Sequence, residues 1–221
     1  MRPRAGSGSD LLAYYAARAR EYERIYDKPE RQADLRVLET AVAAWLEGRE
    51  VVEIACGTGY WTRFIAPAAR RVLALDANPE TLEIARAKAL PPEKVRFDVA
   101  DAYALEPSLG QFDAAFAGFW WSHVPRDAQP AFLASLRARL VAGAVLVMLD
   151  NRYVQGSSTP VSRTDARGNT YQLRRLHDGS AHEVLKNFPS AAELRGALRE
   201  FAEEIEVREL RHYWLLRCRV R

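Results

Sequence analysis

The sequence predicts an α/β fold with a doubly wound, mostly parallel sheet, and three observations carry this prediction. Short apolar runs that contain an acidic residue alternate with helical segments, and the first two of these runs are 51–54 and 72–76. A turn with two glycines joins the first run to the next helix. The last two apolar runs, 204–210 and 213–220, are separated by only two residues. These two must be antiparallel, because a parallel crossover needs a dozen or more residues.

The glycine turn and the acid after it form the pattern of a nucleoside site. Gly57 and Gly59 have no Cβ, so the backbone there can approach a ligand closely. Asp76 ends the second apolar run, where a ribose presents its two hydroxyls. A dinucleotide site needs a third small residue, so that the helix start meets a pyrophosphate. Tyr60 and Trp61 follow the glycines instead, which argues against a dinucleotide.

With Glu53 ahead of the glycines and Asp76 after them, the pattern resembles motif I and the following acidic motif of the class I S-adenosylmethionine-dependent methyltransferases. The family form is acid-x-Gly-x-Gly-x-Gly, and this chain departs from it by carrying Ala55 at the first glycine. Three later segments resemble the family's third, fourth and fifth strands in the right order: 95–102, 112–119 and 140–150. The resemblance implies a Rossmann-like, seven-stranded sheet with one antiparallel C-terminal strand.

The same resemblance implies S-adenosyl-L-methionine as the cofactor and S-adenosyl-L-homocysteine as its product. In the family, the acid at Asp101, followed by the small residue Ala102, lies beside the adenine amino group. The resemblance assigns cofactor contacts to Tyr22, Glu53, Ala55, Gly57, Gly59, Trp61, Asp76, Ala77, Asp101, Ala102 and Phe119.

The implied activity is methyl transfer to a nitrogen, oxygen or sulfur atom of a small polar metabolite. Two alternatives stay open. The first is a methyltransferase that acts on protein or RNA, but the amino-methyltransferase tetrapeptide (Asn or Asp, then Pro-Pro-Tyr or Pro-Pro-Phe) is absent, and residues 118–121 stand in its place. The second is a catalytically inactive regulatory protein that binds S-adenosylmethionine without turnover.

Length and composition predict one domain over residues 10–221, preceded by a short, polar, disordered tail at 1–9. The formal charge of +3 is spread along the chain, and no basic stripe predicts a nucleic-acid partner. No membrane-length apolar run or signal peptide is visible, so we expect a cytoplasmic protein that is a monomer or homodimer. The two cysteines, Cys56 and Cys218, predict no disulfide, and no cluster predicts a metal.

Residues 10–46 predict two helices ahead of the first strand. The first, over 11–26, is amphipathic and bears Tyr14 and Tyr22. Its tyrosines either pack on the sheet as those of an ordinary surface helix or, as the resemblance implies, belong to a lid over the cofactor. A proline at position 29 separates it from the second helix, over 31–46.

Residues 151–189 are too long for a simple connection and predict a small antiparallel meander, with turn signals at 166–169 and 177–180. The segment leaves the carboxyl end of the fifth strand, where open α/β sheets bind ligands. We expect it to be a cap over the methyl acceptor. The alternative is a solvated β-arm that makes a dimer contact.

His123 is the candidate catalytic base, since it follows the fourth strand on the loop that faces the acceptor. It could equally cap the helix that follows. Trp120 and Trp121 could contact a cation or wall an apolar pocket. Asn151 and Arg152, at the end of the fifth strand, suit a polar or carboxylate-bearing acceptor. The full set of expected acceptor contacts is Tyr14, Trp120, Trp121, Asn151, Arg152, His182, Lys186 and Asn187.

Overall fold

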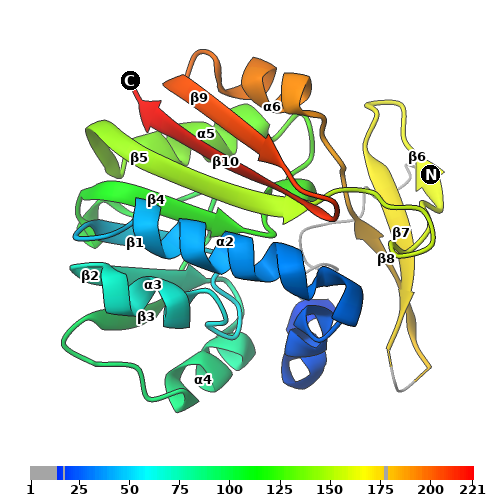
Figure 1. Ribbon diagram of the computed structural model, residues 1–221, viewed down its shortest axis with the longest axis horizontal. Helices are drawn as coiled ribbons and strands as arrows, with labels where there is room; N and C mark the ends of the chain where they lie inside the picture. Colours follow the sequence, from blue (N-terminus) through cyan, green and yellow to red (C-terminus); the bar gives the residue numbers. More distant parts are fainter. Residues whose placement is uncertain (1–13, 17, 177–178) are drawn as a thin grey trace, which may run out of the picture.

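The computed structural model describes residues 14–16, 18–176 and 179–221. Over these residues the chain forms a seven-stranded sheet in the order β3-β2-β1-β4-β5-β10-β9 and a three-stranded sheet in the order β6-β7-β8 (Figure 1). The strands of the large sheet are β1 (Glu50–Ile54), β2 (Arg71–Asp76), β3 (Val95–Val99), β4 (Phe112–Gly118), β5 (Leu140–Asn151), β9 (Ala202–Glu209) and β10 (Tyr213–Val220). The small sheet contains β6 (Arg163–Thr164), β7 (Thr170–Arg175) and β8 (Ala181–Leu185).

Helices cover both faces of the large sheet, which confirms the predicted doubly wound architecture. The α-helices are α2 (Gln32–Trp45), α3 (Thr62–Ala68), α4 (Pro79–Ala87), α5 (Gln129–Arg137) and α6 (Ala191–Leu198). Short 3₁₀ helices are η1 (Ala19–Tyr26), η2 (Pro29–Arg31), η3 (Pro107–Leu109) and η4 (Trp121–His123). Buried residues of α2, α3 and α4 share one apolar cluster, and those of α5 and α6 share the other. None of the described helices has the length and apolar character needed to cross a membrane.

The predicted antiparallel end of the sheet is confirmed. Strands β1 to β5 pair in parallel with their neighbours, whereas β10 pairs antiparallel with both β5 and β9. Only Leu210, Arg211 and His212 join β9 to β10, and the Leu210 amide donates to the Tyr213 carbonyl to close the turn. So short a connection can only reverse the chain direction.

The start of β9 differs from the prediction. The sequence predicts the strand from residue 204, but α6 ends at Leu198 and β9 already begins at Ala202. Glu204 has a φ of 51°, and the pairing with β10 shifts register between Arg217 and Arg219. An irregularity of this kind interrupts the two-residue alternation that locates a strand in a sequence.

The N-terminal segment also differs from the prediction of one amphipathic α-helix over 11–26. Residues 1–13 lie outside the described residues, so the expected tail cannot be compared. From residue 19 to residue 26 the chain is a 3₁₀ helix rather than an α-helix. Pro29 follows closely and is the first residue of η2, and short 3₁₀ segments are common where a helix meets such a turn. The second helix forms as expected, as α2.

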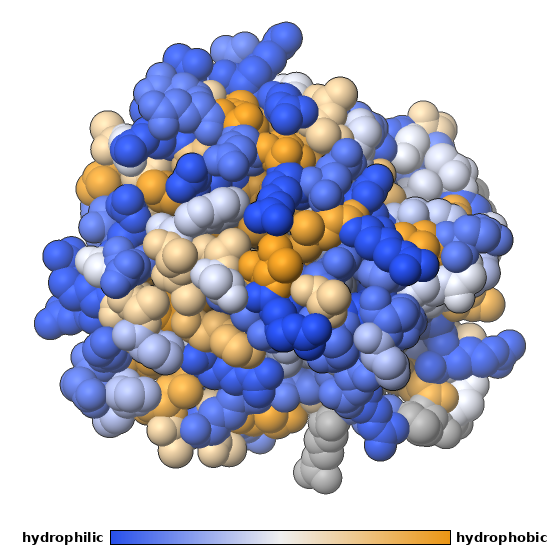
Figure 2. Space-filling model, in the orientation of Figure 1, coloured by the Kyte–Doolittle hydropathy of each residue, from blue (hydrophilic) through white to orange (hydrophobic). Residues whose placement is uncertain are grey.

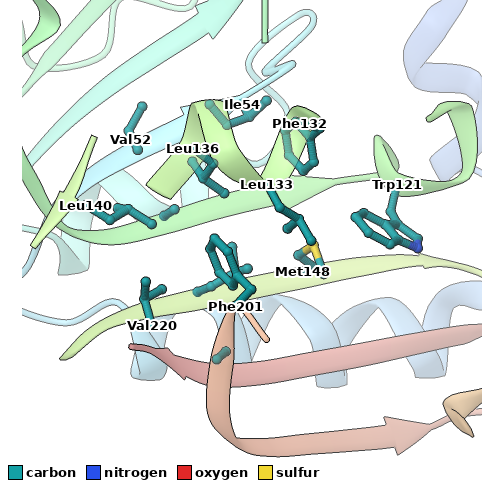
Figure 3. Packing of buried hydrophobic residues seen from close by; sticks show 14 of the residues in the cluster. Val52, Ile54, Trp121, Phe132, Leu133, Leu136, Leu140, Met148, Phe201 and Val220 are labelled. Atoms are coloured by element: carbon teal, nitrogen blue, oxygen red, sulfur yellow. The ribbon is translucent and has the colours of Figure 1, made fainter. Parts of the chain in front are cut away.

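The core lies in two layers on either side of the sheet. In the layer beneath α5, Phe132 and Leu136 pack against Met148 of β5, and Trp121 of η4 points into the same cluster (Figure 3). The surface over α2 is mostly hydrophilic, with apolar side chains in separate patches (Figure 2). This face therefore offers no continuous apolar surface.

The topology brings the ends of β1, β2, β4 and β5 to one edge of the sheet, because parallel strands share their carboxyl ends. The three-stranded sheet lies off this edge, and η1 lies next to it (Figure 1). The expected meander over 151–189 is therefore present as β6, β7 and β8. Any ligand bound at this edge would lie between the large sheet, η1 and the small sheet.

Candidate active site

The glycine turn after β1 has left-handed backbone at three positions. Ala55, Gly57 and Gly59 have φ angles of 52°, 56° and 76°. A Cβ added to Gly59 would lie 3.1 Å from the Cβ of Ala85 on α4, so this glycine also allows close packing. Ala55 replaces the family's first glycine, and an alanine in this conformation carries a strain of about 1 kcal/mol. The turn keeps its shape despite this departure.

Asp76 holds the glycine turn and the start of α4 together. One carboxylate oxygen accepts the Gly57 amide at 2.8 Å, and the other accepts the Asn78 amide at 2.8 Å and the Thr81 hydroxyl at 3.1 Å. Burial raises the pKa of Asp76, while these donors oppose the rise. The carboxylate is half-buried at the carboxyl end of β2, and its oxygens can accept further hydrogen bonds.

Glu53 lies beneath the turn and is almost completely buried, with 1% of its surface exposed. The Thr62 hydroxyl donates to its carboxyl group at 2.7 Å. Burial raises the pKa of Glu53 to about 8, with the negative charge of Asp76 adding to the rise. Glu53 is therefore largely protonated at neutral pH in the free protein.

Glu53→Gln should flatten the pH dependence of stability. The folded protein holds a proton on Glu53 that the unfolded chain releases near pH 4.5. The contribution of Glu53 to the free energy of unfolding is therefore complete below pH 4.5 and is lost as the pH rises toward about 8. Between pH 5 and pH 9, the free energy of unfolding measured with urea should decline less steeply for Glu53→Gln than for wild type. Glu50→Gln, on the same strand but paired with Arg70 near the surface, is the control. Equal slopes for all three proteins would contradict the assignment.

The N-terminal 3₁₀ helix η1 lies on the glycine turn. A Cβ on Gly57 would lie 3.9 Å from the Tyr22 ring, and Glu23 accepts hydrogen bonds from the Thr58 hydroxyl and from Lys88, the residue after α4. Tyr26 stacks on Tyr60 with ring centroids 3.5 Å apart. The structure thus brings Tyr22 beside the expected cofactor residues.

Asp101 and Ala102 follow β3 at the same edge of the sheet. Asp101 is exposed and accepts the Tyr103 amide at 2.9 Å, whereas Ala102 is buried. Val99, two residues earlier at the end of the edge strand β3, is 56% exposed. Ala77, beside Asp76, is exposed as well. These residues form an accessible flank suited to a flat, partly apolar group.

A pocket of about 420 Å³ opens between η1, the end of β5 and the small sheet. This volume falls within the range of small-molecule sites. Its lining is strongly basic, and Glu21 is its one acidic residue in the part of the chain that the structure describes. The basic lining residues are Arg18, Arg24, Lys28, Arg31, Arg174, Arg175 and Lys186. Tyr14, Tyr22, Phe119, His123 and Asn151, all predicted site residues, also line it.

His123 lies in this pocket with both ring nitrogens bonded. Nδ1 is 2.7 Å from the Leu185 carbonyl, which can only accept, so Nδ1 carries the proton. Nε2 therefore accepts from the Tyr15 hydroxyl at 2.8 Å. Burial, followed by the charges of Lys186 and Arg174, lowers the pKa of His123 well below its usual value. The imidazole is neutral at physiological pH and keeps its lone pair on Nε2.

Most of the pocket lining was not predicted from the sequence, and the missed residues include Tyr15, Arg18, Arg31 and Arg174. Arg174 donates to the Gln172 side chain, two residues earlier on β7, at 2.9 Å. Arg31 is buried and donates to Asn151 at 2.9 Å and to Ser157. Side chains alternate between the two faces of a strand, so the predicted strand between the two turns places Gln172 and Arg174 on the same face. This alternation could have indicated Arg174 as a pocket residue. No comparable pattern marks Arg31.

Three expected acceptor residues face elsewhere. Arg152 turns toward the β9–β10 turn, where it donates to the Leu210 carbonyl at 2.6 Å and pairs with Glu209. Asn187 is buried, and it accepts from the Thr170 amide and donates to the Val124 carbonyl. His182 bonds Ser180 at 2.9 Å and does not line the pocket. Backbone groups and carboxylates next to these side chains explain their orientation.

The tryptophans are also placed differently from the prediction. Trp121 is 1% exposed and packs on Phe132 in the core (Figure 3), and Trp120 packs on Tyr103 and Phe132. Trp61, an expected cofactor contact, lies 3% exposed in the opposite core layer. Large aromatic side chains gain most by full burial, so Trp121 lies beneath the site rather than in its lining, whereas Trp120 stays partly exposed.

Comparisons with known proteins agree with this geometry. Residues 51–143 match the family model described as a methyltransferase domain. The solved complex of DhpI with SAH is 32% identical with a TM-score of 0.78, and the match covers 96% of each chain. The DhpI-SAM-HEP complex is 30% identical with a TM-score of 0.80, covering 99% of this chain and 100% of that one. The chain belongs to the class I S-adenosylmethionine-dependent methyltransferases.

More distant structures show the fold alone. The 1,6-didemethyltoxoflavin-N1-methyltransferase of Burkholderia thailandensis is 19% identical, with a TM-score of 0.66 over 100% of this chain and 92% of that one. A search of curated proteins found no match.

S-adenosylmethionine is the cofactor of this methyltransferase, and the donor set at the edge of the sheet fits it. The Asp76 carboxylate suits the two ribose hydroxyls, and the left-handed Gly57 leaves the turn free of a side chain. No group of three or more His, Cys, Asp and Glu side chains in the described ranges could hold a metal ion.

Proposed function

We propose that this methyltransferase transfers the methyl group to an oxygen, nitrogen or sulfur atom of a small polar metabolite that carries an oxyanion. The observation that carries the proposal is the basic lining of the pocket beside the cofactor residues. Seven basic side chains face a cavity of about 420 Å³, against one acidic residue among those described. Such a concentration of positive charge favours a carboxylate or a phosphate-type group over a neutral or cationic acceptor.

The size of the pocket supports a small acceptor. Most of its lining comes from described residues of the N-terminal segment and of the segment 151–189, and we propose that the two segments act as a lid and a cap. Lys28 and Arg31 both donate to the Ser157 carbonyl, so the two segments are held to each other. The Burkholderia enzyme, which has the same fold and was solved with bound 1,6-didemethyltoxoflavin, is in line with a small acceptor.

The residues of the pocket suit the chemistry of the transfer. Bound S-adenosylmethionine supplies a methyl group that is already activated on a sulfonium. The protein must align the acceptor with it and, where the attacking atom carries a proton, remove that proton. Tyr15 and His123 form a relay in which the phenol oxygen takes the acceptor's proton while its own proton passes to Nε2. An acceptor whose oxyanion itself attacks the methyl group carries no proton there and needs no base.

His123→Ala should lower turnover on the order of 100-fold while leaving S-adenosylhomocysteine binding close to wild type, because a base acts on the acceptor. Steady-state kinetics and calorimetry measure the two effects. His182→Ala, a cap histidine outside the pocket, is the comparison variant. If His123→Ala retains turnover at every pH, the histidine is structural and the acceptor attacks without assistance.

The proposed function is tested by S-adenosylhomocysteine release on a panel of small metabolites. One arm contains carboxylates, one contains phosphate and phosphonate compounds, and a third contains neutral and cationic compounds of similar size. Turnover confined to the anionic arms supports the proposal, and their ratio distinguishes the two anion types. Turnover confined to the third arm contradicts it. Cofactor binding with no turnover in any arm would favour the regulatory protein, and turnover on protein or RNA alone would favour a macromolecular acceptor.

A further inference from the structure

A buried ion pair lies beneath the acceptor pocket, with Lys186 in the pocket lining and Asp150 behind it. Lys186 Nζ donates to an Asp150 oxygen at 2.8 Å and to the Ser122 hydroxyl at 2.6 Å. The Lys186 side chain is 5% exposed and the Asp150 side chain is 0% exposed. Asp150 also accepts the backbone amides of Ser122 at 3.0 Å and Asn151 at 2.7 Å. Two segments that meet at the pocket, the end of β5 and the residues after β8, are therefore joined through one carboxylate.

Two guanidinium groups and a neutral imidazole lie near this pair. Arg174 approaches from β7, Arg31 from η2 and His123 from η4. Burial lowers the pKa of Lys186, the two arginines lower it further, and the Asp150 carboxylate opposes them. Burial alone would favour the neutral acid at Asp150, but the charge of Lys186 and the hydrogen bonds donated to the carboxylate outweigh it and lower the pKa of Asp150.

We propose that Asp150 is a positioning residue that keeps Lys186 protonated and directed into the acceptor pocket. The inference rests on the proposed function, since it takes Lys186 as a contact of the acceptor's oxyanion. Of the acidic groups around Lys186, Asp150 is the one bonded to its ammonium in the described structure. Without it, a lysine buried beside two arginines would release its proton, and the pocket would lose one positive charge.

The choice of lysine supports this role. Lysine changes its pKa readily when buried, whereas arginine stays charged. The chain has only four lysines, at positions 28, 88, 94 and 186, beside many arginines, and Lys186 is the one that is buried. The positive charge of Lys186 depends on the Asp150 carboxylate beside it. The pH at which acceptor binding weakens should therefore depend on Asp150.

The first experiment needs no acceptor. With ¹³C-labelled lysine, four side-chain signals are expected, and Lys186→Met assigns the one of interest. Lys186 should titrate at lower pH in Asp150→Asn than in wild type, whereas Glu206→Gln, which removes the acid of an exposed pair with Arg217, should leave it unchanged. Inorganic phosphate added to the protein saturated with S-adenosylhomocysteine should shift the Lys186 signal. An unchanged titration in Asp150→Asn, or no response to phosphate, overturns the proposal.

The second experiment uses the acceptor found by the metabolite panel. In Asp150→Asn the acceptor KM should match wild type at low pH and rise on the order of tenfold at high pH, with kcat changing little. A uniform loss at every pH would mean that Asp150 only supports the fold, and would overturn the proposal. Asp150→Asn leaves the buried Lys186 ammonium without its carboxylate, which destabilises the fold. Where Asp150→Asn does not fold, Asp150→Asn/Lys186→Met serves, since it removes both charges.

In a double-mutant cycle, the acceptor KM of Asp150→Asn/Lys186→Met should equal that of Lys186→Met, because Asp150 acts through Lys186. An additional loss in the double variant overturns the proposal. Where no anionic compound is turned over but the Lys186 titration and phosphate response are as expected, the proposed function fails while the ion pair keeps its role.

Discussion

Asp76→Ala should weaken S-adenosylhomocysteine binding at least tenfold, as measured by calorimetry. The carboxylate is half-buried at the carboxyl end of β2, where it suits both ribose hydroxyls, and a hydrogen bond to a charged group contributes about 1.5–3 kcal/mol. Its loss also releases the Gly57 amide, so the turn that faces the cofactor loses its anchor. Both effects lower affinity.

The same substitution leaves the Gly57 and Asn78 amides without their acceptor, so we expect the unfolding free energy to fall by about 1–3 kcal/mol. Circular dichroism must therefore show that Asp76→Ala is folded before binding is compared. Asp98→Ala is a matched control, because Asp98 lies opposite Leu75 on the neighbouring strand β3 and pairs only with an exposed Arg96 in the described structure. Folded Asp76→Ala with wild-type affinity would remove Asp76 from the cofactor site.

Arg174→Met should raise the KM for an anionic acceptor by about 10- to 100-fold and leave S-adenosylhomocysteine binding unchanged. Arg174 projects from β7 into the basic pocket, held by Gln172 at 2.9 Å and lying 5.9 Å from the Tyr14 ring centroid. A guanidinium held in this way can form a paired hydrogen bond with an oxyanion, and methionine keeps the apolar length of the side chain without the charge.

Arg163→Met is the matched control for Arg174→Met. Arg163 belongs to the same small sheet, but it pairs with Glu183 on the surface at 2.5 Å and does not line the pocket. Steady-state kinetics with the acceptor found by the metabolite panel should separate the two variants. Equal KM values for Arg174→Met and wild type would show that the positive charge of the pocket does not select the acceptor.

Local patterns were sufficient to predict the sheet and its cofactor edge. The ends of β1 and β2, the turn with Gly57 and Gly59, and the reversed strand after Leu210 each follow from residues close together in the sequence. The start of β9 was not predicted correctly, because Glu204 has a left-handed backbone that interrupts the alternation. The 3₁₀ form of η1 has no sequence pattern of its own.

The acceptor side was harder to predict, because it is assembled from segments far apart in the chain. Arg31, Asn151 and Arg174 meet only after η2, β5 and β7 have packed, and no spacing in the sequence indicates that meeting. Arg152 was expected in the pocket from its position, but the open carbonyl of Leu210 lies on its other side. Trp121 was expected at the site and is buried beneath it, because an indole gains more from the core.

The central claim is that an anionic acceptor lies in the basic pocket next to the Asp76-anchored cofactor. A crystal structure with S-adenosylhomocysteine and the acceptor found by the metabolite panel tests it most directly. We predict that the oxyanion lies within hydrogen-bond distance of Arg174 or Lys186 and that the attacking atom of the acceptor faces the cofactor sulfur. An acceptor whose charged group points away from both side chains, or that binds outside the pocket, would contradict the claim.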